Sequence, residues 1–426
     1  IAELKVTIKA QNQRIRELEA KLEDKESQRK QLLSYLYKPN KETNEQKKMG
    51  KKPGASAYHR PLPKEEEVTR TQSFPLTQCP LCEKQLSKPA ETHIRYQEDI
   101  DLAPRKRITK FIIDRYWCSN CETFVRSTEI PIISRIGKNV MAYILYARYR
   151  LRLPQKQIKQ SLSDLHDFEI SEGEISEKIE EASMLFGKDY QAVSELISTA
   201  KTVYADESGW RMNGENWWLW AFVTKKATRY VIEETRGGGI PQMILGTENK
   251  DRVIISDGYA VYQKLTGDKQ QCWVHLLRNA KMFSPLLYRK LAPLYERLGQ
   301  ELTKPINQRD PPWFLQQLDN LIQKSSQDQG THKIQERIRR HRDQLLTCLR
   351  YEGILPENNT AERAIRPQVV MRKIFGGSRS INGAQTHAIN TSVIETMRQQ
   401  HPNLSFFETI VPLIEQRMEE RAHSRV

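Results

Sequence analysis

The stretch TVYADESGW, residues 202–210, decides the fold class once it is placed beside RVIISDGYAVY, residues 252–262. Each opens with the β-branched and aromatic residues that favour a strand, and each run stops at an acid, Asp206 and Asp257. Turn residues separate these runs from two further β-rich runs, so residues 201–262 predict a sheet of short strands. Because α/β sheets present functional side chains at the carboxyl ends of strands, we expect both aspartates to lie at strand ends and to face one crevice.

A third acid, Glu362, lies in ENNTAERAIR at the predicted start of a helix, with Asn359 or Thr360 able to cap it. Any one of the three acids could be a cap, a turn residue or a surface charge. Acids that face one crevice repel each other unless a cation lies between them, and oxygen ligands of this kind bind Mg²⁺ or Mn²⁺. Together the three acids on a basic protein predict a site for such a cation.

Helical periodicity surrounds the predicted sheet. Leucines at helical spacing predict a helical insertion at about 276–355, and residues 136–200 predict a helical connector in which Ser171 and Glu174 have the spacing of a capping box. The second helix of the connector is rich in Glu, which argues against a helix-turn-helix that reads DNA, because these carboxylates would repel phosphates. Residues 401–426 predict a C-terminal helix.

The N-terminal residues form two compositional segments. Residues 1–38 place apolar side chains at most a and d positions, which predicts a coiled coil, although a single helix packed on its own domain is the alternative. Residues 39–70 are polar, basic and rich in Gly and Pro, which predicts a linker. Its lysines could be a solvated spacer or a flexible arm on phosphates.

Two CxxC pairs indicate a structural metal site in residues 71–135. Four thiolates in two such pairs suit tetrahedral zinc and leave no open position for catalysis, whereas a redox role would need only one pair. We therefore predict a zinc ribbon whose ligands are Cys79, Cys82, Cys118 and Cys121. Basic residues that are candidates for DNA binding, or for a merely solvated face, are Arg105, Lys106, Arg107 and Lys110.

Composition limits the class of protein. The 426 residues include 68 Lys+Arg and 53 Asp+Glu, a net charge of +15, which favours a polyanionic partner. Residues 1–150 alone hold 30 basic and 19 acidic residues, so most of the excess is N-terminal. No apolar run approaches the length of a spanning helix and no signal peptide opens the chain, so we expect a cytoplasmic protein without membrane partners. Residue 1 is Ile, as in a sequence that lacks its native start.

Several segments resemble one known family. YADESGW, SDGYAVY, CWVHLLRNA and NNTAERAIRP, together with the CPLC and CSNC pairs after a coiled coil, are similar in order and character to the DDE transposases of the insertion sequence 66 family. The resemblance implies an RNase H-like mixed sheet in residues 201–400, in an α/β fold that carries the helical insertion. It also implies that Asp206, Asp257 and Glu362 are the catalytic triad.

Basic residues follow Glu362 on its predicted helix. If Glu362 holds metal beside a scissile phosphate, its neighbours on the helix border the DNA backbone, although a solvated helix face is the alternative. The candidates are Arg363, Arg366, Arg372 and Lys373. His275 in CWVHLLRNA is a weaker candidate, because a packed core histidine and a phosphate contact explain it equally well.

The sequence therefore predicts a DNA transposase. It would bind insertion-sequence ends, hydrolyse phosphodiesters to give 3′ hydroxyls, and transfer these to target DNA by two-metal catalysis. Expected partners are double-stranded DNA (transposon ends and target), a second copy of the chain in a homodimer or higher assembly, and accessory proteins of the same element, in a prokaryotic nucleoid. The alternatives are a transposase-derived DNA-binding regulator without catalysis and a metal-dependent nuclease without strand transfer.

Overall fold

The computed structural model divides the chain into two units, residues 1–102 and 103–426, which are described separately. In the first unit the helix η1 (Glu65–Glu67) is a short 3-10 turn, and the predicted coiled coil and linker lie mostly outside the described residues. The described residues are 11, 13, 64–68, 71, 85, 106–110, 116–118, 122–125 and 135–423.

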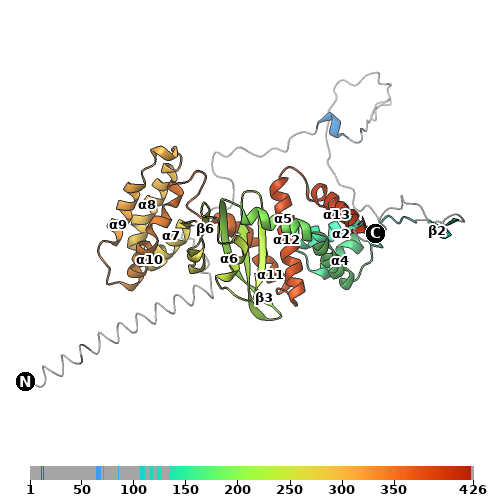
Figure 1. Ribbon diagram of the computed structural model, residues 1–426, viewed down its shortest axis with the longest axis horizontal. Coiled ribbons are helices and arrows are strands. Elements are labelled where there is room, and N and C mark those ends of the chain that lie inside the picture. The colour runs from blue at the N-terminus through green and yellow to red at the C-terminus, as the bar shows by residue number, and fades with distance from the viewer. Residues whose placement is uncertain are drawn as a thin grey trace, which may run out of the picture. The chain divides into compact units, whose positions relative to one another are not determined.

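A five-stranded mixed sheet forms the centre of the second unit (Figure 1). Its order is β5-β4-β3-β6-β7, in which β3, β4 and β5 pair antiparallel while β6 and β7 run parallel to β3. With helices around it, this sheet fits an RNase H-like domain. The strands are β3 (Thr202–Met212), β4 (Glu215–Val223), β5 (Thr228–Glu233), β6 (Val253–Ser256) and β7 (Asp268–Gln271).

Apolar side chains alternate between the two faces of the sheet, as the pleat requires. On β3, Val203 and Ala205 pack with α5 and α6, whereas Tyr204 packs on the opposite face with the side chains of α11. Side chains of α12 also pack on that opposite face. These helices are α5 (Gly187–Ser198), α6 (Gly239–Leu245), α11 (Asn359–Phe375) and α12 (Ile381–Gln400).

The edge strand β5 is protected by the hydroxyl groups of α12. Thr228 N donates to Thr396 Oγ1 over 3.0 Å, and Tyr230 N donates to Ser392 Oγ over 2.8 Å. These bonds satisfy amides that an exposed edge would offer to another strand. The hydroxyls of α12 therefore end the sheet at β5.

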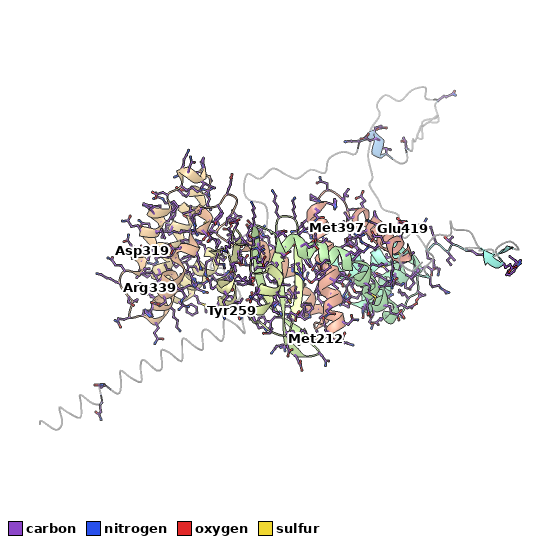
Figure 2. The ribbon with its side chains drawn as sticks, viewed as in Figure 1. Met212, Tyr259, Asp319, Arg339, Met397 and Glu419 are labelled. Atoms are coloured by element: carbon purple, nitrogen blue, oxygen red, sulfur yellow. The ribbon has the colours of Figure 1, made fainter. Side chains whose placement is uncertain are left out.

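The chain between β7 and α11 is helical and packs on the sheet through Val253 and Ile255 of β6 (Figure 1). Three of its helices are preceded by an N-cap residue whose side chain accepts from a backbone N–H, namely Ser284, Asp310 and Asp328. In Figure 2, Asp319 marks α9 and Arg339 marks α10. The helices are α7 (Trp273–Phe283), α8 (Pro285–Glu301), η4 (Ile306–Gln308), α9 (Pro311–Ile322), α10 (Gln329–Leu345) and η5 (Thr347–Leu349).

Helices from both ends of the second unit share another apolar core, to which α12 contributes Val393 and Ile394. The predicted capping box is confirmed: Glu174 N donates to Ser171 Oγ, and Ser171 N donates to Glu174 Oε2. Among the described residues, no helix is both long and apolar enough to cross a bilayer. These helices are α2 (Lys138–Leu145), the π-helix η2 (Tyr146–Arg150), α3 (Gln155–His166), α4 (Glu172–Leu185) and α13 (Phe406–His423).

A short hairpin is described where the second cysteine pair begins. Strands β1 (Tyr116–Cys118) and β2 (Thr123–Val125) pair antiparallel, with Cys118 opposite Thr123. The other three predicted zinc ligands, Cys79, Cys82 and Cys121, lie outside the described residues, as does the side chain of Cys118. The zinc ribbon therefore stays a prediction.

Candidate active site

Asp206 lies in the middle of β3, so the expectation that it ends a strand was wrong. After Asp206 the strand continues to Met212, paired with β4 through an Asn213–Gly214 turn in which both residues have positive φ. This turn chemistry extends the hairpin beyond the apolar run. The parallel pairing of β3 with β6 ends at Tyr204, so Asp206 lies just past the end of that pairing.

The three predicted acids share one electrostatic environment. Burial raises the pKa of Asp206 to about 8, and the negative charges of Glu207, Asp257 and Glu362 add to that rise. Carboxylates raise each other's pKa only when they lie close together in a medium that screens them poorly. The fold thus brings Asp257 and Glu362 near Asp206 although more than 150 residues separate the first acid from the last.

Asp257 follows the last residue of β6, as predicted. Its Oδ1 accepts from Tyr259 N over 2.9 Å. The loop that contains this bond leads into η3 (Ala260–Lys264), and Tyr259 is labelled in Figure 2. Gly258 has a φ of +92°, and a Cβ there would lie 2.2 Å from Gln271 Oε1. Glycine suits this position because it has no Cβ and adopts positive φ without strain. Gly258 therefore lets the loop after Asp257 lie close against Gln271 of β7.

Glu362 lies in the first turn of α11, but the helix is not capped as expected. The N-cap residue is Asn358 rather than Asn359 or Thr360, and its side chain makes no capping bond. Instead Asn358 Nδ2 donates to the carbonyl of Ala205 over 2.8 Å, and Asn358 N donates to Cys272 Sγ over 3.3 Å. This buried asparagine, which sequence reasoning missed, joins the start of α11 to the residue next to Asp206.

His275, in the first turn of α7, faces Glu362. Its Nδ1 lies 3.5 Å from Glu362 Oε1, and both atoms are buried without a hydrogen-bond partner. Burial lowers the pKa of His275, while the charges of Glu362 and Asp257 act in the opposite direction. His275 therefore contacts the acid cluster, whereas its neighbours Trp273 and Leu276 belong to the apolar core of the helical insertion.

A fourth acid, Glu207, lies beside the predicted ones but points to the other face of β3. Its carboxylate is 1% exposed and accepts from Arg236 Nη2 over 2.6 Å and from Tyr262 Oη over 2.8 Å. The Arg236 guanidinium lies over the rings of Trp218 and Tyr259. This network fastens the loop that carries Tyr259 to β3. Sequence reasoning did not single out Glu207. The signal that could have found it is the pair of adjacent acids, Asp206 and Glu207, on one predicted strand.

The cluster suits hard divalent cations. Asp206, Asp257 and Glu362 supply carboxylate oxygens, the ligands preferred by Mg²⁺ and Mn²⁺. Burial and the neighbouring carboxylates raise the pKa of Asp206, and the buried Glu362 Oε1 has no hydrogen-bond partner among the described residues, so a cation at this place would relieve both costs. The three acids are therefore suitable ligands for Mg²⁺ or Mn²⁺.

The predicted DNA-binding residues occupy different environments. On α11, Arg363, Arg366 and Lys373 are exposed, whereas Arg372 is partly buried and donates to the carbonyl of Gly209 on β3. Before the connector, Lys106, Arg107 and Lys110 are exposed, and Lys106 Nζ lies 3.3 Å from Asp167 Oδ2. Arg105 lies outside the described residues.

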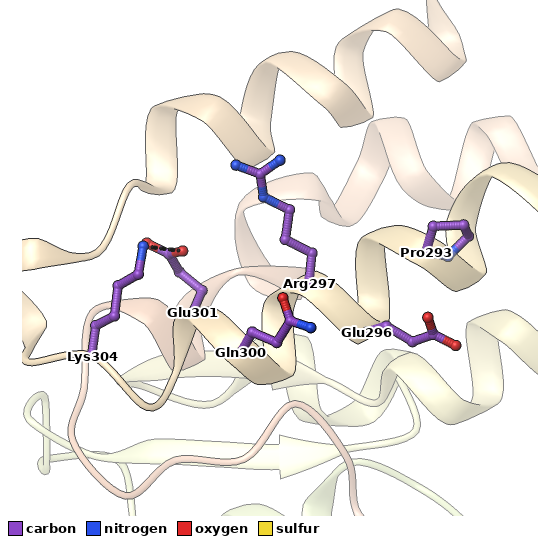
Figure 3. A pocket seen from close by; sticks show the side chains of 6 residues that line it. All are labelled: Pro293, Glu296, Arg297, Gln300, Glu301 and Lys304. Atoms are coloured by element: carbon purple, nitrogen blue, oxygen red, sulfur yellow. Dashed lines mark hydrogen bonds and ion pairs between the residues drawn. The ribbon is translucent and has the colours of Figure 1, made fainter.

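A pocket of about 380 Å³ beside α8 offers no comparable chemistry (Figure 3). Its charged side chains serve the local fold: buried Glu301 accepts from Lys304 Nζ and from Asp310 N, and Arg297 lies over the Trp313 ring. Figure 3 shows Lys304, which follows the end of α8, turned back toward Glu301. The acid cluster is therefore the candidate active site.

Comparison with known proteins agrees with this location. The family model of the transposase IS66 family matches residues 134–386, more than half of the chain. The matched region contains all three acids as well as His275 and Asn358. The search of curated proteins found no match.

Proposed function

This chain belongs to the transposase IS66 family, and from this premise we propose that it cuts DNA at the ends of its element and joins those ends to target DNA. The observation that best supports this chemistry is the raised pKa of Asp206, to which both Asp257 and Glu362 contribute. Three acids from separate elements lie together in a partly buried place, where they repel each other, and a cationic ligand would relieve that repulsion.

Asp206, Asp257 and Glu362 would hold two Mg²⁺ or Mn²⁺ ions. When bound, such ions activate the attacking oxygen and stabilise the leaving oxygen of an in-line displacement. Asp206 must first release its proton, because a protonated carboxyl group is a poor ligand. The bond from Tyr259 N would hold the Asp257 carboxylate in place, and Asn358 would hold the helix of Glu362 against β3.

Two successive displacements at phosphorus would complete the reaction. In the first, water adds to the scissile phosphate and the 3′ oxygen leaves as a hydroxyl group after taking up a proton. In the second, that 3′ hydroxyl loses its proton, attacks a phosphate of target DNA and displaces the 3′ oxygen of the target strand. The protein forms no covalent bond to DNA in this scheme.

Exposed basic side chains would place the DNA. Arg363 and Arg366 follow Glu362 by one and four residues, so on the helix they border any phosphate at the acid cluster. Zn²⁺ would stabilise the fold of the predicted ribbon, whose basic side chains would contact the DNA of the element end. Because two ends must be held together before joining, a homodimer or higher assembly, with accessory proteins of the element, would form on nucleoid DNA.

The test is incubation of the full chain with labelled element-end DNA, unlabelled target DNA and Mg²⁺ or Mn²⁺. We expect cut and joined products from wild type and from Asp251→Asn, an exposed control, but none from Asp257→Asn. Cutting without joining would instead support a nuclease. DNA binding without products from any of the proteins would support a non-catalytic regulator.

A further inference from the structure

A second group of metal-ligating side chains meets where α7 and α11 begin. Ligand atoms of Cys272, His275 and Glu362 all lie within 4.8 Å of one another. Cys272 is the residue just before α7, His275 lies in its first turn, and Glu362 lies in the first turn of α11. Two helix starts therefore direct a sulfur, a nitrogen and an oxygen to one point.

These three side chains are held in place by the fold. Cys272 is buried, and its Sγ accepts from Asn358 N over 3.3 Å. Asn358 is itself anchored to Ala205 of β3. Burial raises the pKa of this thiol, while the backbone N–H groups of Asn358 and His275 that point at the sulfur act in the opposite direction.

The contact between His275 and Glu362 is incomplete as it stands. Nδ1 and Oε1 lie 3.5 Å apart, both are buried, and neither has a hydrogen-bond partner. Buried polar atoms without a partner are costly, so a ligand between them would stabilise the fold. In tetrahedral zinc sites, neighbouring ligand atoms are about 3.5 Å apart, as the bond lengths of 2.0–2.3 Å require.

The donor set differs from that of the three acids. A thiolate and an imidazole select zinc-like ions, whereas carboxylates alone suit Mg²⁺ and Mn²⁺. We propose that Cys272, His275 and Glu362 form a site for one thiophilic divalent cation of the Zn²⁺ class. Three protein ligands leave a fourth position open, and Glu362 is common to this site and to the proposed catalytic pair.

Sharing Glu362 has a regulatory consequence, which rests on the proposed function. An ion held by Cys272 and His275 engages Glu362 and withdraws it from the Mg²⁺ pair. Zinc would therefore inhibit DNA cutting through a site that Mg²⁺ does not fill. The existence of the zinc site does not depend on whether the protein cuts DNA.

The site is tested by counting metal in the full chain. We compare wild type, Cys272→Ser, His275→Gln and a control, Cys348→Ser, which changes a second buried free cysteine among the described residues. After loading with Zn²⁺ and desalting, we expect wild type and Cys348→Ser to hold one more zinc per chain than the other two variants. Equal zinc content in all four folded proteins would overturn the proposal.

Cobalt distinguishes this site from the predicted ribbon, which is common to all four proteins. Titration with Co²⁺ should give thiolate-to-cobalt absorption in the near ultraviolet, and the difference between Cys348→Ser and Cys272→Ser isolates the contribution of Cys272. If Cys272→Ser does not fold, as judged by circular dichroism, His275→Gln provides the same comparison by zinc count. A difference spectrum without charge-transfer absorption would overturn the assignment of sulfur as a ligand.

The regulatory consequence is measured in the DNA-cutting assay with Mg²⁺ held in excess. Added Zn²⁺ should inhibit wild type at least tenfold more strongly than Cys272→Ser, each compared with its own rate without zinc. Equal inhibition would overturn the competition. Absence of cutting by wild type under all conditions would contradict the proposed function and leave the zinc count unaffected.

Discussion

Arg337 of α10 donates through Nη2 to the main-chain carbonyl of Asp257 over 2.5 Å. The guanidinium therefore joins the helical insertion to the loop that carries a predicted catalytic acid. Burial lowers the pKa of Arg337, and the negative charge of Asp257 opposes that change. Residues 80 positions apart are thus coupled both by a hydrogen bond and by charge.

Replacement of Arg337 should impair catalysis more than folding. Arg337→Ala removes the bond that fixes the backbone at Asp257, and a small displacement of this proposed metal ligand should lower the rate about 10- to 100-fold. Steady-state cutting of element-end DNA measures this loss. Arg340→Ala, an exposed arginine on the same helix, is the matched control and should cut at the wild-type rate. Equal rates for the two variants would show that the insertion does not position Asp257.

The raised pKa of Asp206 makes the stability of the metal-free protein depend on pH. The folded protein keeps a proton that the unfolded chain, with a pKa near the ordinary 3.8, has released. Between about pH 4 and pH 8 the folded state thus binds more protons, so stability falls as pH rises through this window. Asp206→Asn removes the titrating group and should raise the melting temperature at pH 8 by at least about 3 °C, with little change near pH 4.

Thermal unfolding with chelator at several pH values measures this effect. Asp251→Asn, an exposed aspartate, should not change the pH dependence. Mg²⁺ at pH 8 should stabilise wild type and leave Asp206→Asn unchanged. A constant difference in melting temperature between wild type and Asp206→Asn at all pH values would mean that Asp206 titrates normally.

Local patterns predicted most of the elements that carry the acids. The apolar runs ending at Asp257, the capping box at Ser171 and the helical leucine spacing all depend on neighbours in sequence, and the structure contains each of them. The position of Asp206 within its strand was missed, because the length of a hairpin depends on pairing with β4. Asn358 was missed for a similar reason: its partners Ala205 and Cys272 lie far away in the chain.

Asn358 gives a test of how Glu362 is positioned. Asn358→Ala removes a buried bond to the carbonyl of Ala205, so we expect a loss of about 1–3 kcal/mol in the free energy of unfolding. Cutting should fall as well, because the start of α11 is no longer fixed beside Asp206. Urea denaturation and the cutting assay measure the two effects. Asn359→Ala is the matched control; a greater loss of stability in this control would mean that Asn359 fixes the helix after all.

The basic residues of α11 should divide into two functional groups. Arg363 and Arg366 are exposed beside Glu362, whereas Arg372 donates to the carbonyl of Gly209. Neutral replacement of the exposed pair should weaken DNA binding and reduce the dependence of log Kd on log salt by about two phosphate contacts, with little loss of stability. Arg372→Gln should instead lower the stability with little effect on DNA binding or its salt dependence, because the Arg372 guanidinium donates to the sheet. Salt titrations of DNA affinity and urea denaturation separate the effects, and an unchanged salt slope for Arg363→Gln/Arg366→Gln would indicate a merely solvated helix face.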